Sequence, residues 1–301
     1  MILFPEAKIN IGLLVTRKRP DGYHILQTLF YPIDWCDALE IIERREDTEN
    51  PNEGVQTADG RITWYQSGIT VDCDPELNLC VKAYRLLQER YPELPAVEMH
   101  LQKDVPFGAG LGGGSSDGAH ALLILREMFK LDITDAELES LTARMGADCA
   151  FFCRCGNRLN TAANEGRMQS QYCEGVGHEL QPHTLSLRGK YIVVVKPPFG
   201  VSTREAYSGV RPVMPETSLE ELLKRPIEEW KECIHNDFED SVFPQYPQLN
   251  AAKEVLYRHG AIYASMSGSG SALFGIFENE QHDCASWFGA GYIARGHWAL
   301  V

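Results

Sequence analysis

The sequence predicts an α+β protein with two domains. Strand patterns and helical patterns occur in both halves of the chain, and 301 residues are enough for one large or two moderate domains. A shift toward polar composition near residues 155–175 marks the boundary between the predicted domains, which are residues 1–160 and residues 161–301.

The predicted strands have alternating or continuous apolar residues, and the predicted helices have apolar residues at helical spacing. The strands are residues 8–15, 26–31, 38–42, 69–71, 97–102, 191–195, 261–265 and 272–277. The helices are residues 79–90, 115–129, 135–145, 218–224, 227–234 and 249–259. A turn at residues 19–22 joins the first two strands, and the polar residues 44–60 are expected to form an exposed loop.

The most informative segment is the glycine-rich run at residues 106–118. Its five glycines before residue 115 can take positive φ and let the backbone approach a ligand closely. Ser115, Ser116 and Asp117 follow where a helix is expected to begin. A helix N-terminus offers unpaired N–H groups and the positive end of the helix dipole, which together bind phosphate. The run therefore predicts a phosphate site, where the two hydroxyls can bind phosphate or a magnesium ion.

Two common phosphate loops fit this context poorly. Gly108, Gly110 and Gly113 have the G-x-G-x-x-G spacing of a dinucleotide-binding turn. However, the preceding strand alternates in polarity and is followed by Lys103 and Pro106, unlike the buried strand of that fold. The G-x-x-x-x-G-K-[ST] motif of a Walker loop does not occur. A loop of a third kind is expected, and an oxidoreductase is disfavoured.

The composition fits a cytoplasmic enzyme with a small-molecule substrate. The formal net charge of −14 disfavours binding to nucleic acid or an anionic membrane, so a bound nucleotide needs local cations, for which Lys8 and Lys103 are candidates. No apolar run approaches the roughly 20 residues that span a bilayer, and no signal peptide is expected. The nine cysteines indicate reduced thiols, and their spacing does not favour a zinc site.

Three segments in order along the chain resemble the motifs of the GHMP kinase superfamily. They are residues 7–10 (Ala-Lys-Ile-Asn), residues 106–117 and residues 266–274. Residues 21–28 and 146–148 are further similar to the branch that phosphorylates a cytidylated methylerythritol in non-mevalonate isoprenoid synthesis. The resemblance covers nearly the whole chain. It implies a two-domain GHMP fold with the active site in the cleft between domains, and ATP and Mg²⁺ as cofactors. The nucleotide loop that it implies comprises Pro106, Phe107, Gly108, Ala109, Gly110, Leu111, Gly112, Gly113, Gly114, Ser115 and Ser116.

Asp148 is the predicted catalytic base. An alcohol is a poor nucleophile, so a carboxylate that accepts its proton assists phosphoryl transfer. Asp148 follows Gly146, which is expected to turn the chain after a helix, and the adjacent Phe151 and Phe152 are expected to keep the site dry. An exposed aspartate at a helix end is the structural alternative.

Lys8 is the second predicted catalytic residue. A lysine between Ala7 and Ile9 is costly to bury without an anionic partner, whereas an exposed lysine at a strand edge is the alternative. The resemblance implies that Lys8 pairs with Asp148 and that Asn10 lies close by and binds substrate.

Tyr23 and His24 are predicted to recognise the substrate's base by stacking and by hydrogen bonds, although a pair that only stabilises the turn is an alternative. The resemblance implies that Tyr207 is a second stacking aromatic. It also implies a closing loop with Ser267, Gly268 and Ser269.

Two rival functions remain open at this point. One rival is a kinase of mevalonate or homoserine, which is disfavoured because those substrates have no base to stack on Tyr23. The other is a non-catalytic binding protein with this fold, which is disfavoured because such a protein does not need both Lys8 and Asp148. Glu6 and His120 depart from the family's pattern, and His120 is interpreted as a solvated helix residue without a role.

Overall fold

The computed structural model describes residues 1–44, 54–70, 74–156 and 169–301, which form two compact units. The first unit comprises Met1–Ala7, Trp35–Phe107 and Gly113–Arg167, and the second comprises Lys8–Asp34, Gly108–Gly112 and Met168–Val301. The units thus interleave along the chain, unlike the predicted segments 1–160 and 161–301. The predicted cut itself falls outside the described residues.

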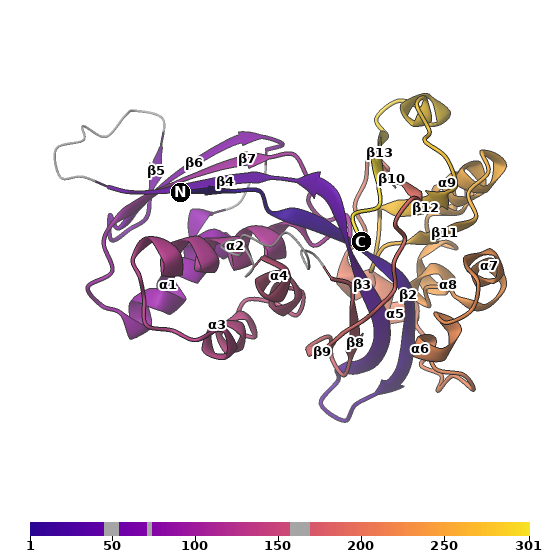
Figure 1. The fold of residues 1–301 in the computed structure, drawn as a ribbon, viewed down its shortest axis with the longest axis horizontal. Coiled ribbons are helices and arrows are strands. Elements are labelled where there is room, and N and C mark those ends of the chain that lie inside the picture. Colours follow the sequence, from indigo (N-terminus) through magenta and orange to yellow (C-terminus); the bar gives the residue numbers. More distant parts are fainter. Residues whose placement is uncertain (45–53, 71–73, 157–168) are drawn as a thin grey trace. The chain divides into compact units, whose positions relative to one another are not determined.

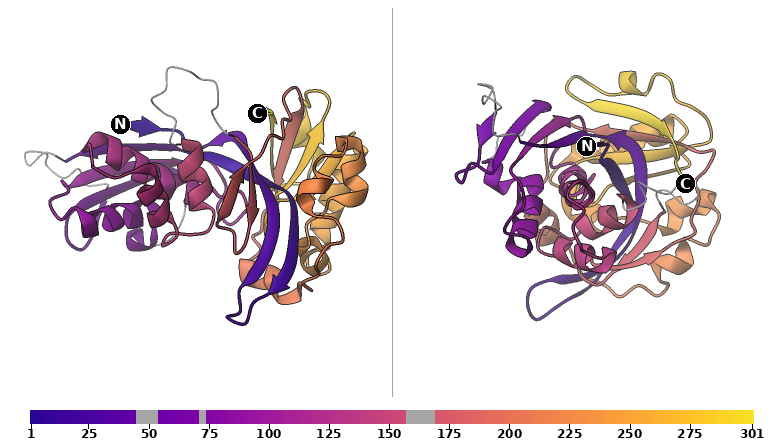
Figure 2. Two further views of the ribbon diagram at one scale, coloured as in Figure 1. Left: turned by 60° about the horizontal axis from the view of Figure 1, so that its bottom comes forward. Right: turned by 60° about the vertical axis from the view of Figure 1, so that its left-hand side comes forward.

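The first unit contains a five-stranded sheet with four helices on one face (Figures 1 and 2). In spatial order its strands are β1 (Ile2–Leu3), β4 (Ala38–Glu43), β7 (Val97–Lys103), β6 (Ile62–Gly68) and β5 (Val55–Gln56). β6 and β7 are parallel, and the other neighbours are antiparallel. Val97, Met99 and Leu101 alternate along β7 and are buried, so the sheet has one core face.

Among the helices of the first unit, α1 and α3 begin at sequence-encoded caps and α2 begins in the glycine run. They are α1 (Leu79–Arg90), α2 (Gly113–Met128), α3 (Asp135–Thr142) and α4 (Cys149–Gly156), with a 3₁₀ turn at Pro75–Leu77. Asn78 caps α1, and Thr134 forms a capping box with Glu137 at α3. α2 packs against both α1 and α4, which buries nearly all of its side chains.

The second unit contains two four-stranded sheets. One consists of β2 (Glu6–Lys18), β3 (His24–Cys36), β8 (Gln171–Glu174) and β9 (Glu179–Pro182). The other has the order β11 (Tyr263–Met266), β12 (Leu273–Phe277), β10 (Tyr191–Lys196) and β13 (Ile293–Trp298), and its pairs are antiparallel. β10 is buried along its whole length because it is a central strand of its sheet.

The helices of the second unit are α5 (Thr203–Gly209), α6 (Leu219–Leu222), α7 (Trp230–Cys233), α8 (Phe238–Val242) and α9 (Pro247–Arg258), with 3₁₀ turns at Ile227–Glu229 and Cys284–Trp287. α6 lies against β2 and β3, where Leu219 N donates to Gln27 Oε1 at 3.2 Å. Apolar side chains of α5, α8 and α9 form one core with those of β10, β11 and β12. This core fixes β11 and β12, whose connecting loop carries the predicted closing residues.

The predicted elements are largely confirmed, with four corrections. The predicted strand at residues 69–71 is wrong for residues 69 and 70, because β6 ends at Gly68, where φ is +80° and a Cβ would lie 2.1 Å from the Lys103 carbonyl oxygen, while residue 71 lies outside the described part. The helix predicted over residues 135–145 ends at Thr142. The predicted loop 44–60 contains the short strand β5, and residues 45–53 lie outside the described part. The sequence prediction also missed β1, β6, β8, β9, β13, α4, α5 and α8.

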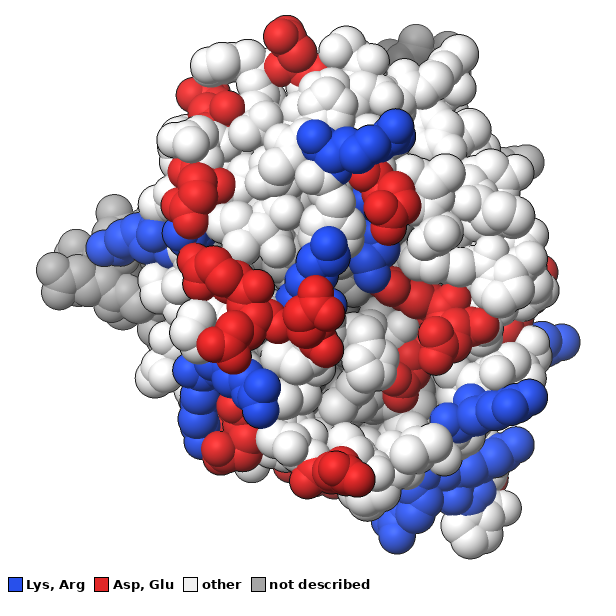
Figure 3. Space-filling view, turned by 90° about the vertical axis from the view of Figure 1, so that its right-hand side faces the viewer, with Lys and Arg blue, Asp and Glu red and all other residues white. Residues whose placement is uncertain are grey.

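The described part of the chain contains no helix of the length and apolarity needed to cross a bilayer. Figure 3 shows one face of the molecule, where acidic and basic side chains are interspersed. The field over this face is therefore mixed in sign.

Candidate active site

The glycine run adopts the conformation that its sequence predicts. φ is +63° at Gly108, +75° at Gly110 and +71° at Gly112, a region that residues with a Cβ rarely adopt. α2 then begins at Gly113, two residues before the expected start. The run contributes residues 108–112 to the second unit and residues 113 onward to the first.

Within the second unit, Lys8 lies at the centre of a network that joins three distant motifs. Its Nζ donates to Asn10 Oδ1 at 2.6 Å and to the Gly110 carbonyl oxygen at 3.0 Å, and it lies 5.1 Å from the centre of the Phe30 ring. The Ser267 hydroxyl donates to the same Gly110 oxygen at 2.8 Å. Lys8 is buried, so the prediction of an exposed strand-edge lysine is excluded.

The glycine run and the loop 267–270 pack so closely that each requires glycine. A Cβ on Gly110 would lie 2.0 Å from the Ser267 carbonyl oxygen, and a Cβ on Gly268 would lie 3.3 Å from Asn10 Oδ1. Backbone bonds add to this contact, since Lys8 N donates to Leu111 O at 2.9 Å and Ala272 N donates to Ala109 O at 3.0 Å. Ala109 and Leu111 are thereby buried as part of the second unit.

Asn236 supports the closing loop and was missed in the sequence. Its buried Nδ2 donates to the carbonyl oxygens of Met266 and Gly268, each at 2.8 Å. Its Oδ1 accepts from Phe238 N at 3.0 Å. No periodic pattern marks this residue, because its partners lie in a different part of the chain.

Of the three residues predicted to recognise the base, His24 and Tyr207 are in contact, and no contact of the Tyr23 ring with them is described. The His24 ring stacks on Tyr207, with centroids 4.8 Å apart and planes 24° apart, and burial followed by the charge of Lys18 lowers the pKa of His24. Tyr23 is instead 65% exposed beside the turn. Ser269 Oγ lies 3.3 Å from Thr203 Oγ1, which links the closing loop to the first residue of the helix that carries Tyr207.

In the first unit, the first turn of α2 has two glycines, of which Gly113 is tightly packed and Gly114 has open space where a Cβ would lie. A Cβ on Gly113 would lie 2.9 Å from Val105 Cγ1 and 3.0 Å from Lys103 Nζ, whereas a Cβ on Gly114 would meet no atom within 4 Å. Ser115 is half-buried, but Ser116 is fully buried with its Oγ 3.4 Å from His120 Nδ1. The open side of the turn is therefore at Gly114 and Ser115.

Lys103 is not the nucleotide-binding cation that the sequence suggested. Its buried Nζ donates to Asp37 and, at 2.8 Å, to Asp117 Oδ2. Asp37 Oδ1 also accepts from the backbone N–H groups of Asp104 and Val105, at 2.6 and 2.8 Å. Burial raises the pKa of Asp117 to about 7, against the lowering effect of Lys103. This cluster, which we call the Lys103 cluster (Lys103, Asp37 and Asp117), anchors α2 to β7.

Asp148 follows Gly146, which lies beside Ser115 of the same turn. It is half-buried and directly precedes α4, and Gly146 lies so near α2 that a Cβ there would be 3.9 Å from Ser115 Oγ. Phe151 and Phe152 are both fully buried and pack edge to face, so they anchor α4 in the core. Phe152 N donates to the Asp148 carbonyl oxygen at 3.4 Å, and the expectation that the two rings keep the site dry stays a prediction.

The remaining predicted residues differ in exposure. Pro106 is buried, while Phe107 is 67% exposed. His120 is buried on α2 and faces Glu6, so its interpretation as a solvated residue is wrong. Lys8 and Asp148 belong to different units, and their pairing stays a prediction.

A further buried lysine, Lys196, was not singled out in the sequence. Its Nζ donates to the carbonyl oxygens of Pro197 and Phe199, at 2.6 and 2.7 Å, and burial lowers its pKa. The Phe199 oxygen also accepts from Ser271 Oγ at 2.5 Å. Lys196 therefore fixes the segment that leads to α5 and Tyr207.

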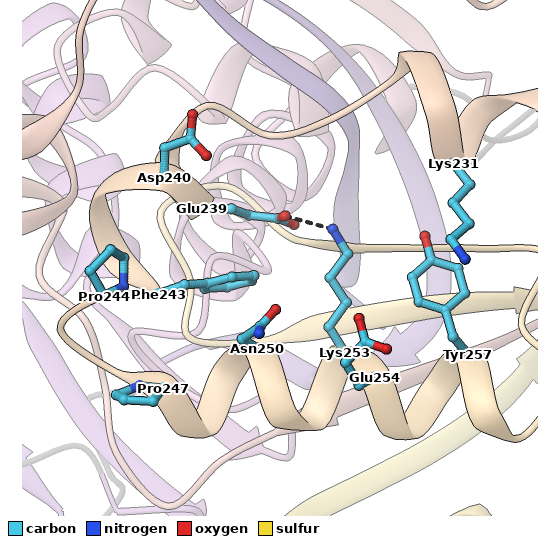
Figure 4. A pocket seen from close by; sticks show the side chains of 10 residues that line it. All are labelled: Lys231, Glu239, Asp240, Phe243, Pro244, Pro247, Asn250, Lys253, Glu254 and Tyr257. Carbon is cyan, nitrogen blue, oxygen red and sulfur yellow. Dashed lines mark hydrogen bonds and ion pairs between the residues drawn. The ribbon is translucent and has the colours of Figure 1, made fainter.

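A pocket of about 570 Å³ between α7, α8 and α9 contains none of the predicted site residues (Figure 4). Glu239 and Lys253 point toward one another across it and form an ion pair of 2.6 Å. Glu239 also accepts from Met266 N at 2.7 Å and from Ser265 Oγ at 3.0 Å. These bonds support the end of β11, directly before Ser267.

Two family models match separate segments of this chain. The family model described as the GHMP kinases N terminal domain matches residues 78–156, and the model described as GHMP kinases C terminal matches residues 218–283. The first match covers α1 to α4, and the second covers α6 to β12.

Curated relatives match along nearly their whole length. The 4-diphosphocytidyl-2-C-methyl-D-erythritol kinase of Bacteroides thetaiotaomicron is 49% identical over 280 residues, which is 93% of this chain and 93% of the relative. The enzyme of that name from Parabacteroides distasonis is 46% identical over 297 residues, covering 96% of this chain and 99% of the relative.

Solved structures agree with this result. A crystal structure of 4-(cytidine 5'-diphospho)-2C-methyl-D-erythritol kinase has 29% identity and a TM-score of 0.75, and the match covers 98% of each chain. The mevalonate kinase of Methanococcus jannaschii has 12% identity and a TM-score of 0.60, covering 92% of this chain and 90% of that one. The second likeness shows a common fold alone.

Proposed function

The chain belongs to the family of 4-diphosphocytidyl-2-C-methyl-D-erythritol kinases, a branch of the GHMP kinases, and from this premise we propose the reaction and the role of each site residue. The reaction is transfer of the γ-phosphoryl group of ATP to the 2-hydroxyl of 4-diphosphocytidyl-2-C-methyl-D-erythritol. The observation that carries this proposal in the structure is the Lys8 network, in which Lys8 and Ser267 of two distant motifs both donate to the carbonyl oxygen of Gly110 in the third.

ATP is assigned to the glycine run and the first turn of α2. The positive φ values open the backbone, and the space over Gly114 leaves room for phosphate at the helix N-terminus. Ser115 offers a hydroxyl on the open side, and Ser116 contributes through its backbone because its side chain faces His120. Pro106 and Phe107 precede the run and border the nucleotide.

Mg²⁺ fits the same turn, because the Ser115 hydroxyl supplies an oxygen ligand of the kind that this ion prefers, beside the oxygens of the ATP phosphates. When bound, the ion neutralises charge on the phosphate oxygens during transfer.

Asp148 acts as the general base and Lys8 as the electrostatic partner. The substrate's 2-hydroxyl oxygen bonds to the γ-phosphorus while the bond from that phosphorus to the β,γ-bridging oxygen breaks, so ADP leaves. The hydroxyl proton passes to the Asp148 carboxylate. Lys8, held by Asn10 and the Gly110 carbonyl, stabilises negative charge at the reacting oxygens.

The cytosine is assigned to Tyr23, His24 and Tyr207. The stacked rings of His24 and Tyr207 already form an aromatic platform, and the exposed Tyr23 ring is available to cover a base. Ser267, Gly268 and Ser269 close over the substrate from the loop that Asn236 holds. This platform is the observation that favours a base-carrying acceptor over mevalonate or homoserine.

The test is phosphorus NMR of the product. Purified protein, ATP and Mg²⁺ are incubated with the cytidylated methylerythritol, and Asp148→Asn serves as the control for a contaminating kinase. The proposal expects a new phosphomonoester resonance coupled to no second phosphorus, together with ADP, from the wild type only. Hydrolysis of ATP without that resonance would contradict the proposal.

A further inference from the structure

The sequence-based interpretation gave no role to His120 or Glu6, yet the structure buries both together within the first unit. His120 lies on the second turn of α2 and Glu6 is the first residue of β2. Their side chains are 3% and 7% exposed, and His120 Nε2 lies 3.3 Å from Glu6 Oε2. A buried carboxylate is costly unless it is paired, so this contact requires an explanation.

The two nitrogens of His120 have partners that fix its protons. Nδ1 lies 2.9 Å from the carbonyl oxygen of Ser116, which can only accept a hydrogen bond. Nε2 faces the Glu6 carboxylate, which also only accepts when ionised. With Glu6 ionised, both nitrogens carry a proton and the ring is an imidazolium ion.

The surrounding charges agree with this assignment. Burial alone would lower the pKa of His120, but the Glu6 carboxylate, the Ser116 carbonyl and the charge of Asp117 raise it above its ordinary value. Glu6 faces the ring from β2 and Asp117 from its own helix, and Asp117 is itself bonded to Lys103 of β7. The second oxygen of Glu6, Oε1, is buried and has no hydrogen-bond partner among the residues that the structure describes, so the ion pair with His120 is the main compensation for burying this carboxylate.

We propose that Glu6 and His120 are positioning residues whose buried ion pair holds the first turn of α2 against the start of β2. His120 bonds the first turn of α2 through Ser116, and Glu6 lies two residues before Lys8 on β2. The pair thereby fixes both the helix end assigned to ATP and the strand that carries Lys8. This inference rests on the proposed function, because ATP binding and kcat are the quantities by which the positioning role is measured.

The pair makes the site sensitive to alkaline pH. When the imidazolium loses its Nε2 proton, the lone pair of that nitrogen faces an ionised carboxylate in a buried place, which is unfavourable. His120 has a raised pKa when folded, so its stabilising effect is complete below the unfolded pKa of about 6.5 and is lost as pH rises through the folded value.

Three variants test the proposal. His120→Leu leaves Glu6 buried and ionised, and is expected to raise the ATP dissociation constant at least tenfold and to lower kcat. Adding Glu6→Gln to His120→Leu removes that charge and is expected to recover most of the loss. His282→Leu is the matched control, because His282 forms an exposed pair with Glu280 at 3.5 Å, and it should bind ATP as the wild type does.

Histidine NMR gives a readout that does not depend on catalysis. The His120 resonance, assigned by its absence in His120→Leu, should titrate above the ordinary histidine range in the wild type and at lower pH in Glu6→Gln. A neutral His120 at pH 7 in the wild type would overturn the ion pair. The same conclusion would follow if Glu6→Gln left the titration midpoint of the His120 resonance unchanged.

The two readouts separate the possible failures. If His120→Leu lowers the melting temperature but keeps ATP affinity and kcat at 25 °C, the pair only stabilises the fold and the positioning role is wrong. If the wild type binds no ATP while its His120 resonance titrates as expected, the proposed function fails and the ion pair stands. If His120→Leu does not fold, the double variant must still bind ATP within a fewfold of the wild type, or the proposal is overturned.

Discussion

Two groups of side chains flank the first turn of α2, and they differ in how their charges are compensated. The Lys103 cluster lies on the packed side, where Lys103 bonds two carboxylates and Gly113 has no room for a Cβ. Asp148 lies on the other side, half-buried, near Ser115 and the open space over Gly114. The comparison shows that one side of this glycine-rich turn packs in the core of the first unit, while the other side is the one assigned to ATP. Changes on the two sides should therefore separate stability from activity.

The largest expected effect is on the packed side. Lys103→Met leaves Asp37 and Asp117 buried without their cation, and breaking such a pair costs about 3–5 kcal/mol of unfolding free energy. Urea unfolding at pH 7 measures it, with the exposed Lys224→Met as a control that should unfold as the wild type does.

The same variant has a predicted pH dependence. Burial raises the pKa of Asp117 to about 7, well above its value of about 3.8 in the unfolded chain. A group with a raised folded pKa stabilises the fold below its unfolded pKa and loses that effect as pH rises through the folded pKa. Lys103→Met should therefore regain stability as pH falls from 7 toward 5, and a deficit independent of pH would contradict the charge explanation.

On the open side, Asp148→Asn should act on chemistry alone. Loss of a general base lowers kcat about 10²-fold or more, whereas ATP affinity and the urea midpoint should stay near the wild-type values. Rapid-quench kinetics with saturating substrates measure kcat. If kcat stays within a fewfold of the wild type, Asp148 is not the base.

The adjacent glycines give the sharpest form of the comparison. Gly114→Ala places a methyl group in the open space at the helix N-terminus, so ATP affinity should fall at least tenfold. Its stability should rise slightly, because alanine is favoured over glycine in helices by about 1 kcal/mol. Gly113→Ala should instead lose about 1–3 kcal/mol of stability through its contacts with Val105 and Lys103. Calorimetry measures ATP binding and thermal unfolding of both variants. Equal losses of ATP affinity and of stability in the two variants would contradict the comparison.

The smallest expected effect is on substrate recognition. Base–aromatic stacking is worth about 1–3 kcal/mol per base, so Tyr23→Ala should raise KM for the cytidylated substrate roughly ten- to a hundredfold. KM for ATP should hardly change, since the glycine run binds that ligand by its phosphates. Steady-state kinetics with each substrate varied in turn distinguish the two, and a rise in the ATP KM would reverse the assignment of the two nucleotide sites.

Local patterns in the sequence predicted the local features of the structure. The α+β class is confirmed, as are the bounds of α1 and the positive φ values of the glycine run. These features depend on neighbours within a few residues, whereas the GHMP fold, also confirmed, was implied by the resemblance of motifs spread along the whole chain. The capping box at Ser202 and Glu205 carries the same kind of signal, and it would have located α5, which was missed.

The errors arise where a side chain's partner lies far along the chain. Lys103 seemed available to a ligand because Asp37 is remote in sequence, and His120 seemed solvated because Glu6 lies at the other end of the first unit's sequence. Asn236 was missed for the same reason. Burial of a polar residue depends on such partners, and no sequence period encodes it.

The most direct test of the account is the ratio of kcat/KM for the cytidylated methylerythritol to kcat/KM for mevalonate and for homoserine, measured with the same ATP and Mg²⁺. The account predicts turnover of the cytidylated alcohol with a strong preference over both others, and loss of that preference in Tyr23→Ala. Efficient phosphorylation of mevalonate or homoserine by the wild type, with no turnover of the cytidylated alcohol, would contradict it.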